Sequence, residues 1–308
     1  MSHSLLYAML PLSSYALRAM RWASPISRAL RWVTGAPIIT VRELILGKNV
    51  IIEPGVEIRC DRLVLGDNVM IKSGTRIDMT DLVIGDYTIV NDRCFLTGTD
   101  WCRIGHNCWF GHYTIIDSIG TTRIGNGVGV GAHSQLWTHA YFGDILEGCR
   151  FASHKPLVIE DDVWLVGQCI VSPIHAAPRS MAMAGSVVTK DMEENHVYAG
   201  VPAKDVTDRL GLQFEEVSLA AKRSRMESYL HEFLDRVRPK QNRIRIVDQL
   251  DMGQRRLSQF SLTERTYIKN LYPEEVMFMR FLRPTKAKFV PAPETDWLAP
   301  HLSSVPER

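Results

Sequence analysis

One histidine, one tryptophan and two lysines between residues 131 and 204 have types and spacing suited to group-transfer chemistry. His139 begins a segment that interrupts a regular repeat, and Trp164 lies on the next repeat. Lys190 and Lys204 follow near the end of the repeats. An imidazole titrates near neutral pH and can take the proton of an attacking hydroxyl, while a lysine ammonium suits phosphates. The set indicates transfer of an acyl group from a phosphate-bearing donor to a hydroxyl or an amine.

The composition indicates a folded chain that stays in a reducing compartment. The chain has 308 residues and a formal net charge of +2, so it can bury a large core and has no global field that favours nucleic acid. Its six cysteines lack Cys-x-x-Cys spacing, so we expect reduced thiols and no metal. The sequence has no apolar run of about 18 residues, and residues 1–12 lack the basic start of a cleaved signal. We therefore expect a cytoplasmic protein.

A repeat of 19 or 20 residues begins at Leu46, where an aliphatic residue is followed by glycine. Within each period an apolar residue returns about every six positions, which is the signature of a hexapeptide β-helix. Each hexad gives a short strand with an inward aliphatic side chain, and then a turn whose Gly, Asn or Asp accepts a positive φ. The spacing is too short for the strands of an antiparallel sandwich. We predict an all-β core formed by a parallel β-helix.

The repeat is interrupted once, between Leu136 and Ile159. The intervening segment of about 20 residues contains Gly143-Asp144, Gly148 and Lys155-Pro156. A long loop inside a compact repeat is usually functional, because the scaffold does not require it. We predict that this loop carries part of a functional site.

The segments on either side of the repeats have helical patterns. We expect an N-terminal helical cap over residues 1–40, a β-helix domain over 41–209 and a helical or α+β extension over 210–308. The cap packs on the open end of the β-helix or, as the alternative, makes a peripheral contact with an anionic membrane surface. In the extension we expect a helix over 214–237, a strand at 244–247, a helix over 261–271 opened by a Ser261–Glu264 capping box, and a helix starting at Pro273.

Residues 45–206 resemble the hexapeptide-repeat acyltransferases. The resemblance is closest to maltose, galactoside and xenobiotic acetyltransferases, and extends to O-acetyltransferases of bacterial polysaccharide assembly. It is carried by four motifs in a fixed order: Thr138-His139, the run from Lys155-Pro156 to Trp164, the run from Ala184 to Lys190-Asp191, and Ala199-Gly-Val-Pro-Ala-Lys204. The resemblance implies a left-handed β-helix, a homotrimer and active sites in grooves between adjacent subunits.

The resemblance also implies roles for residues around the acceptor. His139 matches the catalytic histidine, a general base for direct attack of a hydroxyl on a thioester; the residues alone also allow a hydrogen-bonded loop histidine. Asp117 resembles an acidic residue that holds acceptor hydroxyls, and a plain corner aspartate is the alternative. His112 is a second acceptor-binding candidate.

The donor implied by the resemblance is acetyl-CoA. Trp164 matches a tryptophan near its thiol end, and Gly167 has only a backbone N–H to offer the acyl oxygen. The remaining donor-binding candidates, along the pantetheine arm and at the phosphates, are Ala184, Gly185, Thr189, Lys190 and Lys204.

These observations lead to an acetyl-CoA-dependent O-acetyltransferase that acts on a saccharide hydroxyl in bacterial envelope or capsule polysaccharide synthesis. The alternatives within the enzyme class are an amino-sugar N-acyltransferase and a serine acetyltransferase. From other classes, the alternatives are a non-catalytic β-helix scaffold and a metal protein similar to gamma-type carbonic anhydrases. The metal protein would use three histidines, for which His106, His112 and His133 are available.

Overall fold

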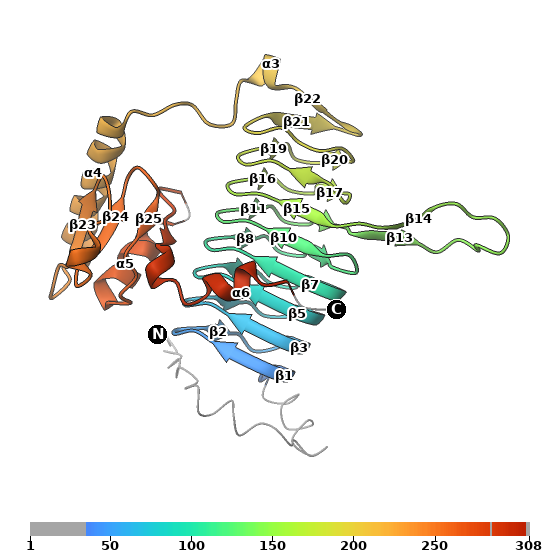
Figure 1. Ribbon diagram of the computed structural model, residues 1–308, viewed down its shortest axis with the longest axis horizontal. Helices are drawn as coiled ribbons and strands as arrows, with labels where there is room; N and C mark the ends of the chain where they lie inside the picture. Colours follow the sequence, from blue (N-terminus) through green and yellow to red (C-terminus); the bar gives the residue numbers. More distant parts are fainter. Residues whose placement is uncertain (1–34, 284, 306–308) are drawn as a thin grey trace, which may run out of the picture.

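The computed structural model describes residues 35–283 and 285–305, and the repeats form a parallel β-helix with three faces (Figure 1). The expected all-β core is confirmed, and the arrangement is consistent with a left-handed β-helix. Four long strands bend so that each contributes first to face 1 and then to face 2: β1 (Ile38–Leu46), β3 (Glu57–Leu65), β5 (Arg76–Ile84) and β7 (Phe95–Ile104).

Later coils use a separate short strand for each face. Face 1 continues with β9 (Ile115–Asp117), β12 (Gln135–Leu136), β17 (Ile170–Val171) and β20 (Val187–Val188). Face 2 continues with β10 (Thr122–Ile124), β15 (Leu157–Ile159) and β18 (His175–Ala176). Face 3 consists of β2 (Ile51–Ile52), β4 (Met70–Ile71), β6 (Ile89–Val90), β8 (Trp109–Phe110), β11 (Gly129–Val130), β16 (Trp164–Leu165), β19 (Met181–Ala182) and β21 (Val197–Gly200), and β22 (Ala203–Asp205) folds back antiparallel on β21.

The aliphatic residues of the sequence repeat point inward and stack from coil to coil. On face 1 the column is fully or almost fully buried: Ile58, Ile77, Leu96, Ile116, Leu136, Val171 and Val188. Faces 2 and 3 have equivalent columns in the same core. Because one coil cannot cover its own aliphatic residues, each is stabilised by the coils above and below it. The six-residue spacing read from the sequence is therefore confirmed.

The three corners of the prism are named here after one residue each. The His139 corner joins face 1 to face 2, the Asp162 corner joins face 2 to face 3, and the Gly185 corner joins face 3 to face 1. At the Asp162 corner, a side chain of each coil accepts a hydrogen bond from a backbone N–H of the coil before it. The donor–acceptor pairs run Asp67 N to Asp86 Oδ1 (2.8 Å), Asp86 N to His106 Nδ1 (3.0 Å), His106 N to Asn126 Oδ1 (2.9 Å) and Asn126 N to Asp161 Oδ1 (2.6 Å).

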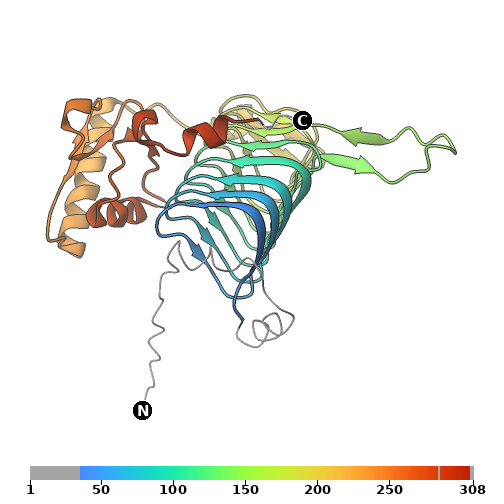
Figure 2. The same ribbon diagram turned by 60° about the horizontal axis from the view of Figure 1, so that its bottom comes forward.

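The interrupting loop leaves the His139 corner as a long hairpin arm. It contains β13 (His139–Tyr141) and β14 (Ala152–His154), paired antiparallel, and it projects away from the β-helix in both views (Figures 1 and 2). Its tip exposes large apolar side chains: Phe142, Ile145, Leu146 and Phe151. An exposed apolar group of this kind marks a contact with another surface.

The C-terminal segment forms a small α+β unit that packs on the Asp162 corner, on the side away from the hairpin arm (Figure 1). After α3 (Thr207–Leu210) and a linker it contains α4 (Leu219–Val237), β23 (Ile244–Val247), a 3-10 turn (Met252–Gln254), β24 (Ser258–Ser261), β25 (Thr266–Tyr267), α5 (Pro273–Leu282), β26 (Val290–Pro291), a 3-10 turn (Pro293–Thr295) and α6 (Ala299–Ser303). Helix α6 lies on face 2, where Leu298 just before it packs on Val64 and Val83.

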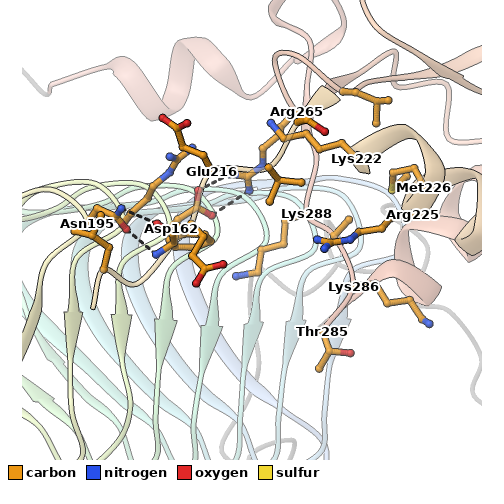
Figure 3. A pocket seen from close by; sticks show the side chains of 18 of the residues that line it. Asp162, Asn195, Glu216, Lys222, Arg225, Met226, Arg265, Thr285, Lys286 and Lys288 are labelled. Carbon is orange, nitrogen blue, oxygen red and sulfur yellow. Dashed lines mark hydrogen bonds and ion pairs between the residues drawn. The ribbon is translucent and has the colours of Figure 1, made fainter. Parts of the chain in front are cut away.

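Ion pairs fasten this unit to the corner. The ammonium of Lys269 lies 2.9 Å from a carboxylate oxygen of Asp67 and 2.7 Å from one of Asp86, and all three side chains are buried. In a later coil of the same corner, Arg265 forms a bidentate ion pair with Asp162, with N–O distances of 2.5 and 3.1 Å (Figure 3). The C-terminal unit therefore covers the Asp162 corner at these positions.

The expectations for the flanks have different outcomes. The strand at 244–247 and the helix at Pro273 are confirmed as β23 and α5, and the helix expected over 214–237 is confirmed over Leu219–Val237 as α4, since Ser218 is its N-cap and residues 214–217 precede it. The helix expected over 261–271 is wrong: Ser261 Oγ does accept from Glu264 N at 3.3 Å, but this closes a turn between β24 and β25. The N-terminal cap lies outside the described residues, except that Ile38 already belongs to β1. Within the described part of the chain, no helix has the length and hydropathy needed to cross a membrane.

Candidate active site

The candidate base, His139, is held by the carboxylate of Asp117. Nδ1 of His139 lies 2.8 Å from Oδ2 of Asp117. The same oxygen accepts the backbone N–H of Thr138 at 2.9 Å and also the Thr138 hydroxyl. Asp117 ends β9, one coil before β12, so the carboxylate lies directly beneath the start of the hairpin arm. One buried side chain thus fixes both the first residues of the arm and the imidazole ring.

This contact determines what the imidazole can do. A nitrogen that faces a carboxylate carries the proton, so the network assigns the hydrogen to Nδ1 and leaves the lone pair on Nε2. Nε2 has no partner among the described residues, and the side chain of His139 is 23% exposed. The carboxylate also stabilises the imidazolium that forms when Nε2 takes a proton. The pair is arranged as a general base with its orienting acid.

Aromatic and polar neighbours border the ring. Trp137 meets it edge-on at a centroid distance of 6.1 Å, and Tyr141 lies at 5.1 Å. Across the hairpin, His154 is the strand partner of His139, and its ring bonds to the carbonyl of Ile119. Thr138, Trp137 and Tyr141 are not among the site residues expected from the sequence. Their position beside His139 was the only available signal.

Asp117 does not have the environment expected of a residue that grips an acceptor. Its side chain is fully buried, and Oδ2 is engaged by His139 and Thr138. Oδ1 is also buried and has no hydrogen-bond partner among the described residues. A hydroxyl of a bound sugar cannot reach this carboxylate unless the arm moves. The geometry therefore favours an orienting role over the acceptor-binding role.

Two donor-binding candidates lie at the same corner as His139. Hydrogen bonds from Trp137 N to Val171 O and from Ser172 N to Val188 O place residues 137, 172 and 189 in one column. Thr189 and Lys190 are exposed and lie two coils beyond the histidine, which is roughly 10 Å along the axis at the usual strand spacing. A linear donor could extend along this corner.

Four other candidates lie at the Gly185 corner. Gly167, Ala184 and Gly185 form successive turns there, and Gly185 has φ of 74° and open space where a side chain would be. His112 is half-exposed at the same corner, where its Nδ1 lies 3.0 Å from a carboxylate oxygen of Asp92. Within one chain, the whole width of face 1 separates these residues from His139.

The last two candidates lie near face 3. Trp164 begins β16 and is 47% exposed, with its indole over Gly129 of the preceding coil. Lys204 is exposed on β22, opposite Ala199. Face 3 lies opposite the His139 corner, so these residues do not meet the imidazole within one chain.

The histidines considered for a metal site do not converge. His106 is buried at the Asp162 corner, where its Nε2 lies 3.2 Å from Asp296. His133 stacks on Tyr113 at 4.9 Å at the Gly185 corner, next to His112. In the described ranges, no group of three or more His, Cys, Asp or Glu side chains is placed to hold a metal ion.

A large cleft of the described structure lies away from His139. A cleft of about 1150 Å³ lies between the Asp162 corner, the linker before α4 and the C-terminal unit (Figure 3). Its walls include Lys222, Arg225 and Lys288 beside the Arg265–Asp162 pair. Cleft size alone would place the site there, but the cleft contains no base aligned by a buried carboxylate. We therefore place the candidate active site at the His139 corner.

No family model matches the chain. Two curated relatives match 105 residues, which is 33% of this chain: "Putative acetyltransferase YJL218W" of Saccharomyces cerevisiae at 32% identity and "Putative acetyltransferase C18B11.09c" of Schizosaccharomyces pombe at 33%. The matched segment spans about half the length of these relatives, 53% and 47% respectively.

Solved structures of similar shape are distant in sequence. AntD, an N-acyltransferase from Bacillus cereus, is 15% identical with a TM-score of 0.38, and the match covers 68% of this chain and 96% of AntD. A maltose O-acetyltransferase from Clostridium difficile is 18% identical with a TM-score of 0.31, over 68% of this chain and 80% of that one. The polysialic acid O-acetyltransferase OatWY is 14% identical with a TM-score of 0.34, over 59% and 92%.

The expected hexapeptide-repeat β-helix is thus confirmed by the structure, and the two curated relatives that match a third of the chain are named putative acetyltransferases.

Proposed function

We propose that this protein is an acyltransferase that moves an acetyl group from acetyl-CoA to a saccharide hydroxyl, with His139 as the general base. The observation that supports this most directly is the Asp117–His139 pair. The buried carboxylate of Asp117 fixes the tautomer of His139, which lies on the projecting arm. The order of sequence motifs around it supports acetyl-CoA as the donor. Bacterial envelope or capsule polysaccharide remains the proposed origin of the acceptor.

The proposed reaction is a direct transfer. Nε2 of His139 takes the hydroxyl proton as the acceptor oxygen attacks the thioester carbonyl carbon, and a new C–O bond forms. The carbon–sulfur bond then breaks, and the protonated His139 returns the proton to the departing thiolate. Asp117 acts as a positioning residue throughout and stabilises the charged ring.

We propose a homotrimer as the active form. Among the described residues, the C-terminal unit covers the Asp162 corner and α6 lies on face 2, whereas no described helix is packed on face 1. The outward side of face 1 is mostly apolar in its upper coils, with Phe95, Ile115, Ile170 and Val187 and one polar residue, Gln135, between Ile115 and Ile170. Three prisms packed through face 1 would bring the His139 corner of one subunit to the Gly185 corner of the next, because these two corners border that face.

This packing would also bring together candidates that one chain keeps apart. His139, Thr189 and Lys190 would come from one subunit, and Gly167, Ala184 and Gly185 from its neighbour. The exposed apolar tip of the hairpin arm would have a surface to contact. Six unpaired cysteines support the expected cytoplasmic location.

The test is a screen of acceptors with acetyl-CoA, read as release of free thiol and as product mass. The panel contains neutral sugars, acidic sugars, amino sugars and serine, and the His139→Ala variant is the blank. A product heavier by one acetyl group on a sugar oxygen supports the proposal. Acetylation confined to amines would favour the N-acyltransferase alternative, and thiol release that is equal in the blank would refute the role of His139.

A further inference from the structure

A second cavity, on the opposite side of the prism from the His139 corner, has a composition that the proposed reaction does not use. It has a volume of about 310 Å³ and lies between face 3 and α5. One wall is apolar and consists of Ile51, Met70, Ile89 and Trp109. The other contains the guanidinium groups of Arg280 and Arg283. No carboxylate lines it.

Arg283 is a partly buried cation without a counter-charge. Its side chain forms no ion pair with any described residue, and its Nε–H is shielded from water without an acceptor. Burial lowers the pKa of Arg283 to about 10, so the group is still charged at neutral pH. An uncompensated buried charge destabilises a fold, and an orphaned donor adds to that cost. A protein that retains such a group gains something from it other than stability.

Two further donors face the same cavity. Asn68, only 7% exposed, accepts at Oδ1 from Arg280 at 3.1 Å and from Asn49 at 3.3 Å. These two bonds fix the orientation of the amide, so its Nδ2 is a donor, and that atom is buried without an acceptor. Arg280 has no carboxylate partner in the part of the chain that the structure describes. Two orphaned donors, Arg283 Nε–H and Asn68 Nδ2, lie beside a second guanidinium, that of Arg280, and together they are the counterpart of a carboxylate or phosphate.

The apolar wall is the start of a longer ladder. Ile51, Met70, Ile89 and Trp109 are paired strand to strand and point outward from face 3. The same column continues through Gly129 to Trp164 and Met181. At the usual strand spacing, the distance from Ile51 to Trp164 is roughly 24 Å. A linear hydrocarbon chain could lie along this column, with Gly129 leaving room between the two indoles.

We propose that this cavity binds the anionic head group of a long-chain amphiphile, with the apolar chain along the face 3 ladder. The head group is a phosphate or a carboxylate, since the planar guanidinium fork binds both. The head-group cavity contains no residue of the proposed reaction, and it is therefore tested in the His139→Ala variant as well as in the unchanged chain. Binding in both proteins separates this proposal from the acyltransferase proposal.

The first test is calorimetric titration of the full chain with dodecyl phosphate and with dodecanoate, below their micelle-forming concentrations. Butyl phosphate, inorganic phosphate and dodecyl maltoside are the comparison ligands. We expect one equivalent of a dodecyl anion to bind at least about tenfold more tightly than each comparison ligand, because both the charge and the chain contribute. Equal binding of dodecyl maltoside or of inorganic phosphate would overturn the proposal, as would no binding of either dodecyl anion. The difference between the two anions identifies the head group.

Substitutions of the cavity arginines give a second test, which compares ligand affinity with the stability of the ligand-free protein. Arg283→Met should weaken binding of the preferred anion by about tenfold or more, since a hydrogen bond to a charged group is lost. It should leave the melting temperature of the ligand-free protein unchanged or raise it, because the uncompensated charge is gone. If Arg283→Met does not fold, the exposed Arg280→Gln must still weaken binding. Arg256→Gln, an exposed arginine elsewhere on the unit, is the matched control and should bind normally. Normal affinity in both cavity variants would sink the idea.

Discussion

Oδ2 of Asp117 lies 2.8 Å from Nδ1 of His139, although 22 residues separate them in the sequence. The β-helix produces this proximity, since β9 and β12 are adjacent strands and residue 117 lies beneath residue 137. Thr138 completes the arrangement by donating its backbone N–H to the same oxygen. The rigid coil thus positions the proposed base, which belongs to an irregular arm, and this is how a precise site can be built on a loop.

Replacing the base tests the centre of the proposal. His139→Ala should lower kcat by about two to four orders of magnitude, the usual contribution of a general base. The β-helix should remain folded, because the ring is part of the arm and not of the aliphatic core. Turnover in the acetyl-CoA assay and the melting temperature are the measurements. His231→Ala, an exposed histidine on α4, is the matched control. Near-normal turnover of folded His139→Ala would rule out the assigned role.

Replacing the orienting acid should have a smaller and different effect. Asp117→Asn keeps the shape but can no longer stabilise the imidazolium, so we expect kcat to fall about tenfold or more, and by less than in His139→Ala. The KM of the acceptor should change little, because the buried carboxylate does not contact it. Steady-state kinetics with both substrates distinguishes the two effects. A large rise in acceptor KM with unchanged kcat would restore the acceptor-binding role.

The β-helix could be predicted because its signal is periodic. Each hexad repeats the same physical requirement, an inward aliphatic residue and a turn, so one irregular coil does not hide the pattern. The site was only partly predictable. His139 stood out because it begins the one interruption, but the function of Asp117 depends on its being one coil below the arm. Counting one 20-residue period back from residue 137 would have revealed this, since the register holds up to that point.

Other features had no local signal. The Ser261–Glu264 pair has the form of a capping box, yet the same bond closes a turn between strands. The choice there is made by packing of β24 and β25 in the C-terminal unit, which the local sequence does not encode. The unit's attachment to the corner was equally hidden, because Lys269 and its partners Asp67 and Asp86 are about 200 residues apart.

The hairpin arm should determine the oligomeric state. Phe142 and Leu146 are 103% and 93% exposed. A single subunit gives no reason to retain two large apolar side chains in solvent. We expect the double variant Phe142→Ser, Leu146→Ser to shift the protein from trimer to monomer and to reduce turnover, without lowering the stability of the coil. Light scattering and the acetyl-CoA assay measure the two effects. Leu212→Ser, an exposed apolar residue of the linker, should alter neither. A fully active monomer would contradict both the trimer and the shared site.

The last coil should have a pH-dependent stability. Nδ1 of His196 lies 2.6 Å from Oδ2 of Asp205, and this bond closes the β21–β22 hairpin that carries Lys204. The hydrogen bond to Asp205 raises the pKa of His196 above 6.5, and the bond to His196 lowers the pKa of Asp205 from 3.8 to about 2. The contribution of His196 to stability is fully present below pH 6.5, and it is lost as pH rises through the raised pKa that His196 has in the folded protein. The contribution of Asp205 to stability is present above pH 3.8, and it is lost as pH falls towards the lowered pKa of about 2.

The hairpin should therefore be best protected between pH 3.8 and 6.5. Hydrogen-exchange protection factors of residues 197–205, corrected for intrinsic rates, should fall as pH rises from 6.5 through the raised pKa of His196. The His196→Gln variant should lose this dependence, because glutamine does not titrate. Protection that rises over the same interval, or an unchanged dependence in the variant, would show that another group controls this coil.

The lysines test the donor. Lys190 is exposed at the His139 corner and Lys204 is exposed on β22, so each can hold a phosphate of acetyl-CoA only as a solvent-screened charge. Replacing either with Ala should raise the KM of acetyl-CoA by about ten- to a hundredfold at low salt, the range of a charge-assisted hydrogen bond. Saturated turnover should barely change, because this contact binds ground state and transition state alike.

Salt and the acceptor provide the controls for the lysine variants. The increase in KM should shrink as ionic strength rises, since exposed charges are screened. Lys240→Ala, another exposed lysine on the C-terminal side, should leave all constants unchanged. The acceptor KM should also stay constant, because the acceptor is placed at His139. If the acceptor KM rises instead, these lysines face an anionic saccharide, and the donor must lie along the other end of the groove.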